Sequence, residues 1–259
     1  MTRRLRGIGP DRPAREGAAT IRAMLLTRLG PAVALLGLLV VALPGPAYRL
    51  GLIALPTAVP LVRYGAFIGA AGLALSVAAL LLAMRRSARQ RPGPALAGVL
   101  LGLVAFGLPF RLAQTASAVP PIHDITTDTT DPPVFSAIVP LRADVPNSLE
   151  YTPEVARLTQ EAYPDLRTLT LPLPAAEAFD RALEAARAQG WDIVAASPDE
   201  GRIEASDTTT WFGFVDDVVI RLTPEGTATR LDIRSVSRVG RSDLGTNARR
   251  IRDYLASLR

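Results

Sequence analysis

The sequence predicts an α+β protein with two parts: an N-terminal region of three transmembrane helices and a C-terminal antiparallel sheet covered by two helices. Residues 1–113 carry 14 Arg against two acidic residues, a net charge of +12, and hold three long apolar stretches. Residues 114–259 carry 15 Arg and 22 acidic residues, a net charge of −7. The pI of 10.3 therefore averages a basic membrane region and an acidic soluble domain, and it does not indicate a nucleic-acid binder.

Three apolar stretches predict the membrane spans. The clearest is 64–84, 21 residues without a charge that end at Arg85. About 20 apolar residues cross the hydrocarbon core of a bilayer, so this length is sufficient. The other two spans are 29–46 and 95–113. The stretch 50–62 is also apolar, but Pro residues interrupt it and it is too short to cross, so we expect an interfacial loop there.

The arginines in the short flanks predict the orientation. Seven lie in 1–28 and four in 85–94, against two in 47–63. Since Arg-rich flanks stay in the cytoplasm, we expect a cytoplasmic basic N-terminus over 1–28. Three crossings then place the C-terminal domain in the periplasm or outside the cell. The alternative is that the first stretch is a cleaved signal peptide, but a clean small-x-small site after Leu43 is lacking.

Glycines occur at four-residue spacing in two spans, as the pairs Gly65/Gly69 and Gly98/Gly102. This spacing lets helix backbones approach closely, so it predicts a packed helix pair or a seam between two copies of the chain. It also arises from the ordinary Gly and Ala content of such helices, and both interpretations stay open. An ionisable residue at mid-span is missing, which argues against a transporter or a proton relay.

The soluble half begins with an extended segment, 114–150, which is rich in Pro, Thr and Asp. A regular domain over 151–259 follows. Alternation, helical spacing and turn signals predict its elements in order. We expect a strand at 166–171, a helix at 174–189, four strands at 191–196, 202–207, 211–222 and 229–236, and a closing helix over 244–258 that is capped by Ser242 or Asp243.

The last hairpin carries enough pattern to predict its register. A four-residue loop at 224–227 places Asp217 opposite Arg234 on the exposed face of the sheet. A slip by one residue would turn the core side chains to water, so we expect the register to be well specified. Val236 no longer fits the alternation, which predicts a bend or bulge in the strand.

The densest polar run is 234–247, which places several guanidinium and hydroxyl groups beside a predicted helix N-terminus. Arg forks, free N–H groups and the helix dipole all favour an anion such as phosphate or carboxylate. The candidate ligand-binding residues are Arg234, Ser237, Arg238, Arg241, Ser242, Asp243 and Asn247, together with Asp217 and His123. The alternative interpretation is a structural network that ties the helix to Asp216, Asp217 and Asp232.

The sequence assigns no catalytic residue, metal or cofactor. Asp216 and Asp217 are adjacent on a strand and point to opposite faces, so they cannot form a close acid/base dyad. His123 is the only His and the chain has no Cys, which disfavours a transition-metal site. Asp124, Asp128 and Asp131 suit a hard cation, although a solvated acidic loop explains them more simply. Gly-rich phosphate loops, nucleotide fingerprints and nucleic-acid surfaces are missing.

Three motifs in order, 122–133, 211–221 and 234–247, resemble domain-of-unknown-function family 1499 over roughly residues 119–257. The resemblance implies an envelope or membrane-associated domain, often behind N-terminal membrane helices. It implies no established activity, substrate or catalytic residue.

We therefore expect a three-pass protein of the bacterial inner membrane that displays a non-catalytic domain. This domain would bind an anionic small molecule, a lipid headgroup or an envelope protein. Two alternatives stay open. The first is an envelope hydrolase that uses His123 or Asp217 with a Ser, and the second is a structural or assembly factor of the cell envelope.

Overall fold

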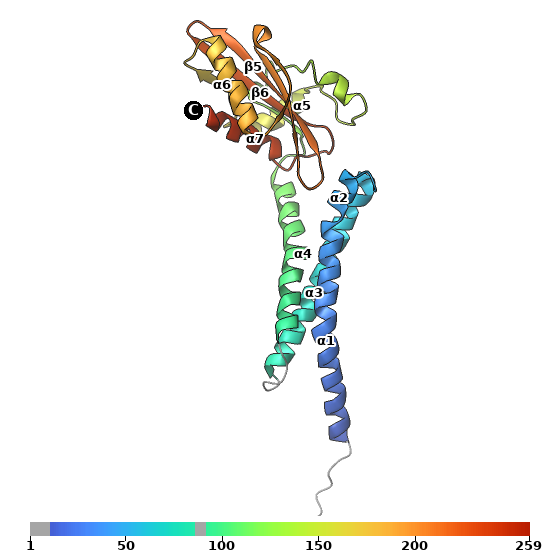
Figure 1. Cartoon of the computed structure of the whole chain (residues 1–259). Helices are drawn as coiled ribbons and strands as arrows, with labels where there is room; N and C mark the ends of the chain where they lie inside the picture. Colours follow the sequence, from blue (N-terminus) through green and yellow to red (C-terminus); the bar gives the residue numbers. More distant parts are fainter. Residues whose placement is uncertain (1–10, 86–91) are drawn as a thin grey trace, which may run out of the picture. The chain divides into compact units, whose positions relative to one another are not determined.

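The computed structural model describes residues 11–85 and 92–259, with side chains described for 27–84 and 92–259. The chain divides into two compact units, Met1–Leu112 and Ala113–Arg259 (Figure 1). The arginines within 1–10 and 86–91, on which part of the predicted orientation rests, lie outside the described residues.

The first unit consists of long apolar helices: α1 (Asp11–Ala42), the short α2 (Pro44–Arg49), α3 (Leu55–Arg85) and α4 (Gly93–Ala118), whose last turns belong to the second unit. Three segments are long and apolar enough to cross a membrane: Thr27–Arg49, Leu55–Met84 and Gly93–Ala118. Large side chains such as Leu36, Leu81 and Leu100 are more than half exposed. Outward-facing Leu is what a lipid-facing helix surface requires, so the predicted three-helix membrane region is confirmed as a fold.

The predicted interfacial loop over 50–62 is wrong, because α3 begins at Leu55 and continues without a break. Pro56 falls in the first turn, where the missing N–H has no helical partner to lose. Pro60 lies inside the helix and removes one backbone hydrogen bond, which a helix among packed neighbours tolerates. The Arg63 guanidinium lies 5.8 Å from the centre of the Phe67 ring.

Glycines bring the membrane helices into close contact. A Cβ atom added at Gly65 would lie 2.7 Å from the Val41 nitrogen of α1, and one added at Gly69 would lie 2.5 Å from the Ala105 Cβ of α4. Both members of the second predicted pair lie against neighbouring helices too, Gly98 against Ser76 and Pro31, and Gly102 against Leu73 and Gly69. The structure therefore uses these glycines for packing within one chain.

The second unit is built on an antiparallel sheet, as predicted, but the sheet has six strands rather than the five expected, because the first strand was not predicted. Its strands are β1 (Asp124–Thr126), β2 (Leu169–Leu171), β3 (Asp192–Ser197), β4 (Arg202–Thr208), β5 (Val215–Glu225) and β6 (Ala228–Ser237). The order is β1-β6-β5-β4-β3, and β2 pairs with β6 beside β1. A 3-10 turn, η2 (Pro198–Glu200), joins β3 to β4.

Two helices cover one face of this sheet: α6 (Ala175–Ala188) and α7 (Thr246–Ser257) (Figure 1). Their buried residues, Phe179 and Ile251 among them, share a core with Ile220 and Ile233 of the sheet. The sequence prediction missed α5 (Pro153–Ala162), whose apolar side packs on the same core. The Thr152 hydroxyl accepts a hydrogen bond from the Val155 N–H and caps this helix.

The register predicted for the last hairpin is wrong by two residues. Glu225 pairs with Ala228, so the loop has two residues rather than four, and Asp217 lies opposite Val236 rather than Arg234. The turn is tight because Gly226 adopts a φ of +65°, a left-handed conformation that favours glycine. A shift by two leaves every side chain on its predicted face.

The sheet face opposite the helices is buried, whereas the sequence prediction placed this face in solvent. Residues 128–149, here called the covering segment, lie across it and contain a 3-10 turn, η1 (Val139–Arg142). Phe135, Ile138 and Leu149 of this segment pack on Val219 and Val236 of the sheet. Val236 is buried in this second hydrophobic cluster, so it fits the alternation of β6. The strand continues to Ser237, and β6 lacks the expected bend.

The covering segment also corrects the domain boundary drawn at 151. Residues 114–150 are not a simple extended linker: they contain the last turns of α4 and η1, and β1 pairs with β6 as an integral strand of the sheet. Helix α7 begins at Thr246 after Gly245, and neither Ser242 nor Asp243 occupies the N-cap position. Asp243 still accepts the N–H of Asn247 from two residues before the cap.

Candidate functional site

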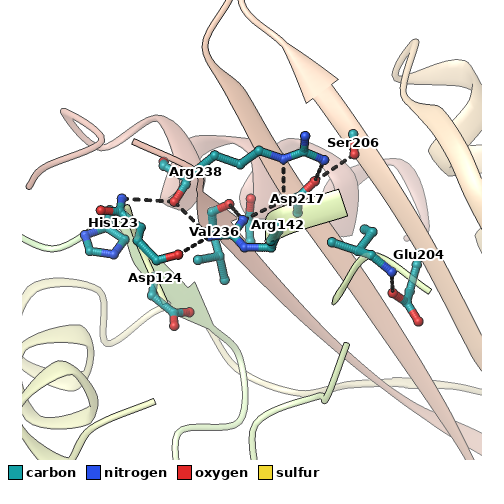
Figure 2. A network of polar contacts seen from close by, with 12 residues as sticks. His123, Asp124, Arg142, Glu204, Ser206, Asp217, Val236 and Arg238 are labelled. Carbon is teal, nitrogen blue, oxygen red and sulfur yellow. Dashed lines mark hydrogen bonds and ion pairs between the residues drawn. The ribbon is translucent and has the colours of Figure 1, made fainter. Parts of the chain in front are cut away.

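Buried charges fasten the covering segment to the sheet, and Asp217 is the clearest example (Figure 2). Its carboxylate is fully buried and accepts hydrogen bonds from Arg142 of the covering segment at 2.5 Å, from Arg238 at 2.8 and 2.9 Å, and from the Ser206 hydroxyl at 2.7 Å. Burial alone would raise the pKa of Asp217, but hydrogen bonds from Arg238, Ser206 and Arg142 together hold it below its ordinary value. This carboxylate is therefore ionised and internally paired.

Glu204 of β4 holds the same segment through its backbone. Its fully buried carboxylate accepts the N–H groups of Ser136, Ala137 and Ile138 at 2.9 to 3.0 Å. Three backbone N–H groups satisfy much of the hydrogen-bonding capacity of this buried carboxylate. The Arg202 guanidinium adds one positive charge, with its Nε 3.1 Å from a Glu204 oxygen. The sequence prediction expected water at the polar side chains of this sheet face, and groups of the covering segment take its place as their hydrogen-bond partners.

Arg234, the first predicted ligand-binding residue, is part of this closure. Its guanidinium is 3% exposed and donates to both carboxylate oxygens of Asp124, at 2.7 and 2.9 Å. It also donates to the carbonyl oxygens of Pro133 and Leu149, near the two ends of the covering segment. Four of its five N–H groups thus donate to protein oxygens, and the centres of the Phe135 and Tyr151 rings lie 5.5 and 5.3 Å from its central carbon, so the guanidinium is committed to the protein.

A second network lies under the N-terminus of α7, on the helix-covered face. The Asn247 side chain accepts from Ser235, and it donates to the Ser237 hydroxyl at 3.1 Å and to the His123 carbonyl at 2.9 Å. Arg250 donates to Asp216 and also to Asp207, at 2.7 Å each. Asp216 and Asp217 therefore do face opposite sides of the sheet, and each meets a different Arg.

Asp243 and Ser242 order the turn before α7. Asp243 accepts the N–H groups of Gly245 and Asn247, at 3.0 and 2.7 Å, and burial raises its pKa. The Ser242 hydroxyl accepts the Leu244 N–H at 3.2 Å. These are local contacts that shape the loop, and they leave little of either side chain to a ligand.

Among the predicted binding residues, Arg241 has a different environment. It is exposed, and within the described residues it makes no ion pair. Arg238 is 20% exposed at its side chain but is committed to Asp217. The predicted cluster is therefore a structural network with one free cation at its rim, and the alternative interpretation of the polar run fits this geometry better.

The residues of the hydrolase alternative do not converge on a catalytic arrangement. The His123 ring points away from Asp217 in Figure 2, and its buried Nδ1 has no hydrogen-bond partner among the described residues. Ser206 does contact Asp217, but a fully buried carboxylate with a lowered pKa is a poor general base and cannot reach a substrate.

The acidic loop suggested for a hard cation is neutralised by Arg221. This side chain pairs with Asp128 at 3.1 Å, Asp131 at 2.8 Å and Asp232 at 3.3 Å. In the part of the chain that the structure describes, no group of three His, Cys, Asp or Glu side chains is placed to hold a metal ion.

The structure also contains two adjoining hollows that the sequence analysis did not identify. The first has a volume of about 390 Å³ and is lined by Thr127, Thr168 and Arg167 among others. The second, of about 400 Å³, is lined by Tyr151 and Thr152 among others. The first is called the Arg167 hollow and the second the Tyr151 hollow. Only the high Thr content of 126–130 could have pointed to them.

Three apolar helices followed by a sheet that is closed on both faces define a membrane-associated protein with a separate α+β domain. Residues 124–258 match the model of the family described as "Protein of unknown function (DUF1499)", and the chain belongs to this family. The resemblance found in the sequence motifs is thereby confirmed. A comparison with curated proteins gives no match.

Proposed function

We propose that this protein is a membrane-anchored, non-catalytic binding protein of the bacterial cell envelope. Its α+β domain lies on the extracytoplasmic side and takes an anionic ligand in the Arg167 hollow. Three spans and the arginine-rich flanks at 1–28 and 85–94 support this orientation.

The observation that supports this ligand site is which arginines are paired with carboxylates and which are not. Arg234 and Arg238 of the predicted cluster, and Arg250 beyond it, are each neutralised by aspartate. Arg167 is exposed and lines a hollow, and within the described residues it donates only to the Pro164 carbonyl, at 3.0 Å. A cation without a carboxylate partner at the wall of a cavity is a binding group for a phosphate or carboxylate.

The carboxylates near Arg167 are paired with other groups: Asp165 with Arg252, and Asp232 with Arg221 and with the Thr127 and Thr168 hydroxyls. No acidic residue lines the Arg167 hollow. Asp128 and Asp131, which flank the lining residue Thr129 in sequence, are both paired with Arg221. Arg157, which lines the Tyr151 hollow, is already held by Glu154 and Glu161 at 2.7 Å each. Of the two arginines that line the hollows, Arg167 is therefore the one without a carboxylate partner in the described part of the chain.

The test is an NMR or calorimetric titration of the full chain, in detergent micelles, with inorganic phosphate. We expect saturable binding that Arg167→Gln weakens about tenfold, the value of one hydrogen bond to a charged group. The control is Arg181→Gln, an exposed Arg of α6 that makes no ion pair in the described part of the chain. Binding that is lost in Arg241→Gln and retained in Arg167→Gln would contradict the proposal.

A further inference from the structure

The two hollows are one groove divided by a side-chain bridge. Thr129 and Gln160 line both hollows. The Gln160 Nε2 donates to the Thr129 hydroxyl at 2.6 Å, which forms the ridge between them. Ligand pockets in proteins measure about 300–1,000 Å³, so each hollow alone accepts a small ligand unit and the groove accepts two that are joined.

Neutral hydrogen-bonding groups form most of the polar wall of the groove. Hydroxyls of Thr and Tyr and the amide of Gln160 line it, and none of the lining residues is acidic. A hydroxyl both donates and accepts, and an amide does the same through two different atoms. Such a wall matches a ligand that presents many hydroxyls of its own.

Several of these hydroxyls have unused hydrogen-bonding capacity. In the described part of the chain, the buried hydroxyls of Tyr151, Thr159 and Tyr163 have no hydrogen-bond partner of good geometry. The Tyr151 and Thr159 hydroxyls lie beside each other, and burial raises the pKa of Tyr151 to about 12. A buried polar group without a partner is rare and costly in a native protein, and a ligand toward which these side chains turn would relieve that cost.

We infer that this groove binds an acidic glycan. An uncharged sugar unit lies in the Tyr151 hollow, and a unit that carries a carboxylate or phosphate lies in the Arg167 hollow with its charge on the guanidinium. This inference rests on the proposed function, because it adds the sugar to an anion site already proposed at Arg167.

The experiment titrates the full chain in detergent micelles with four probes: cellobiouronic acid, cellobiose 6′-phosphate, the neutral disaccharide cellobiose and inorganic phosphate. Ligand-observed NMR measures each dissociation constant. We expect an acidic sugar, with either the carboxylate or the phosphate, to bind at least tenfold more tightly than cellobiose and than inorganic phosphate. The stronger of the two acidic probes identifies the charged group.

Two variants separate the contributions. Arg167→Gln should remove the preference for the acidic sugar and leave cellobiose unchanged. Gln160→Ala should weaken cellobiose and the acidic sugars about three- to tenfold and leave phosphate unchanged, since a neutral hydrogen bond contributes less than a charged one. Gln160 is exposed, so we expect this variant to fold, and the fluorescence of the two tryptophans checks that it does.

The outcomes distinguish the two claims. If phosphate binds through Arg167 as tightly as the acidic sugars do, and Gln160→Ala has no effect, the glycan inference is overturned while the anion site stands. If none of the four probes binds in a manner that depends on Arg167, the proposed function is overturned as well.

Discussion

Replacing Asp217 tests whether buried charges hold the covering segment on the sheet. Asp217→Asn keeps the size of the side chain but removes its charge, and the new amide group turns donors toward Arg142 and Arg238. The Arg142 side chain is 4% exposed, so its charge cannot move into water without opening the segment. Removing one partner of a buried ion pair costs about 3–5 kcal/mol, and we expect a loss of this size in the free energy of unfolding.

Arg238→Gln should cost less. Asp217 would keep Arg142 and the Ser206 hydroxyl, and the side chain at 238 can reach solvent. A hydrogen bond to a charged group contributes about 1.5–3 kcal/mol, which bounds the expected loss. Asp192→Asn is the matched control: this exposed carboxylate on β3 makes no ion pair in the described part of the chain, so its loss should stay within about 0.5 kcal/mol.

Urea unfolding of the full chain in detergent, followed by tryptophan fluorescence, measures these losses. The chain has two tryptophans, Trp191 and Trp211, and both lie in the second unit, so the signal reports the α+β domain. Trp191 is buried and stacks on Tyr254 with 5.1 Å between the ring centres, which makes it sensitive to unfolding. The midpoint and slope give each free energy by linear extrapolation.

The pH dependence gives a second reading of the same pair. The pKa of Asp217 is lowered in the folded state, so its contribution is complete above the unfolded pKa of about 3.9 and is lost as the pH falls through the folded value. The difference between wild type and Asp217→Asn should therefore be constant near neutral pH and shrink below about pH 4. A loss below about 1 kcal/mol at pH 7, similar to that of Asp192→Asn, would refute the buried fastening.

Three further substitutions test other parts of the structure. Glu204→Gln should cost about 1–3 kcal/mol and speed amide hydrogen exchange at the three backbone donors in the covering segment, because one acceptor oxygen becomes a donor; unchanged exchange would contradict this. Gly37→Leu should lower the thermal stability of the detergent-solubilised chain, because its Cβ would enter the backbone of α3, whereas a Cβ added at Gly107 meets nothing within 4 Å, so Gly107→Leu should be tolerated; equal effects would argue against the packing. Gly201→Ala should cost more than about 1 kcal/mol in urea unfolding, because the residue has a φ of +59° and its Cβ would meet a carbonyl of β5; a neutral result would show that the turn adapts.

Patterns with a regular period were sufficient to predict most of the fold. The apolar stretches gave the three long helices, and alternation in β5 and β6 assigned each side chain to its correct face even though the register was displaced by two. The displacement arose because Pro224 and Glu225 continue the strand rather than form the loop. The strand and turn propensities of these residues do not distinguish the two arrangements. The cap at Thr152 was a usable signal for α5, since Thr-Pro-Glu is typical of a helix start.

The covering segment could not be predicted in the same way. It is rich in Pro and polar residues and has no period, so its composition is that of a solvated linker. What buries it is a set of long-range partners: Arg142 meets Asp217 and the backbone around Ser136 meets Glu204, across separations of more than 60 residues. Local sequence carries no information on such pairs.

The candidate site illustrates the same limit. The run 234–247 does concentrate basic and hydroxyl groups at a helix N-terminus, as predicted, but which Arg is neutralised depends on carboxylates from distant strands. Arg167 lies in a loop without any motif, and its significance comes from the hollow beside it and from the absence of an acid among the residues that line it. A count of charges in the sequence does not distinguish an arginine that is paired with a carboxylate from one that is not.

Cysteine labelling most directly tests the central claim that a membrane-anchored domain is displayed outside the cytoplasm. The chain has no Cys, so a single cysteine at the exposed Arg259→Cys position is a unique probe. The account predicts that a membrane-impermeant maleimide labels Arg259→Cys in intact spheroplasts as completely as after lysis. Labelling that requires lysis would place the domain in the cytoplasm and contradict the account.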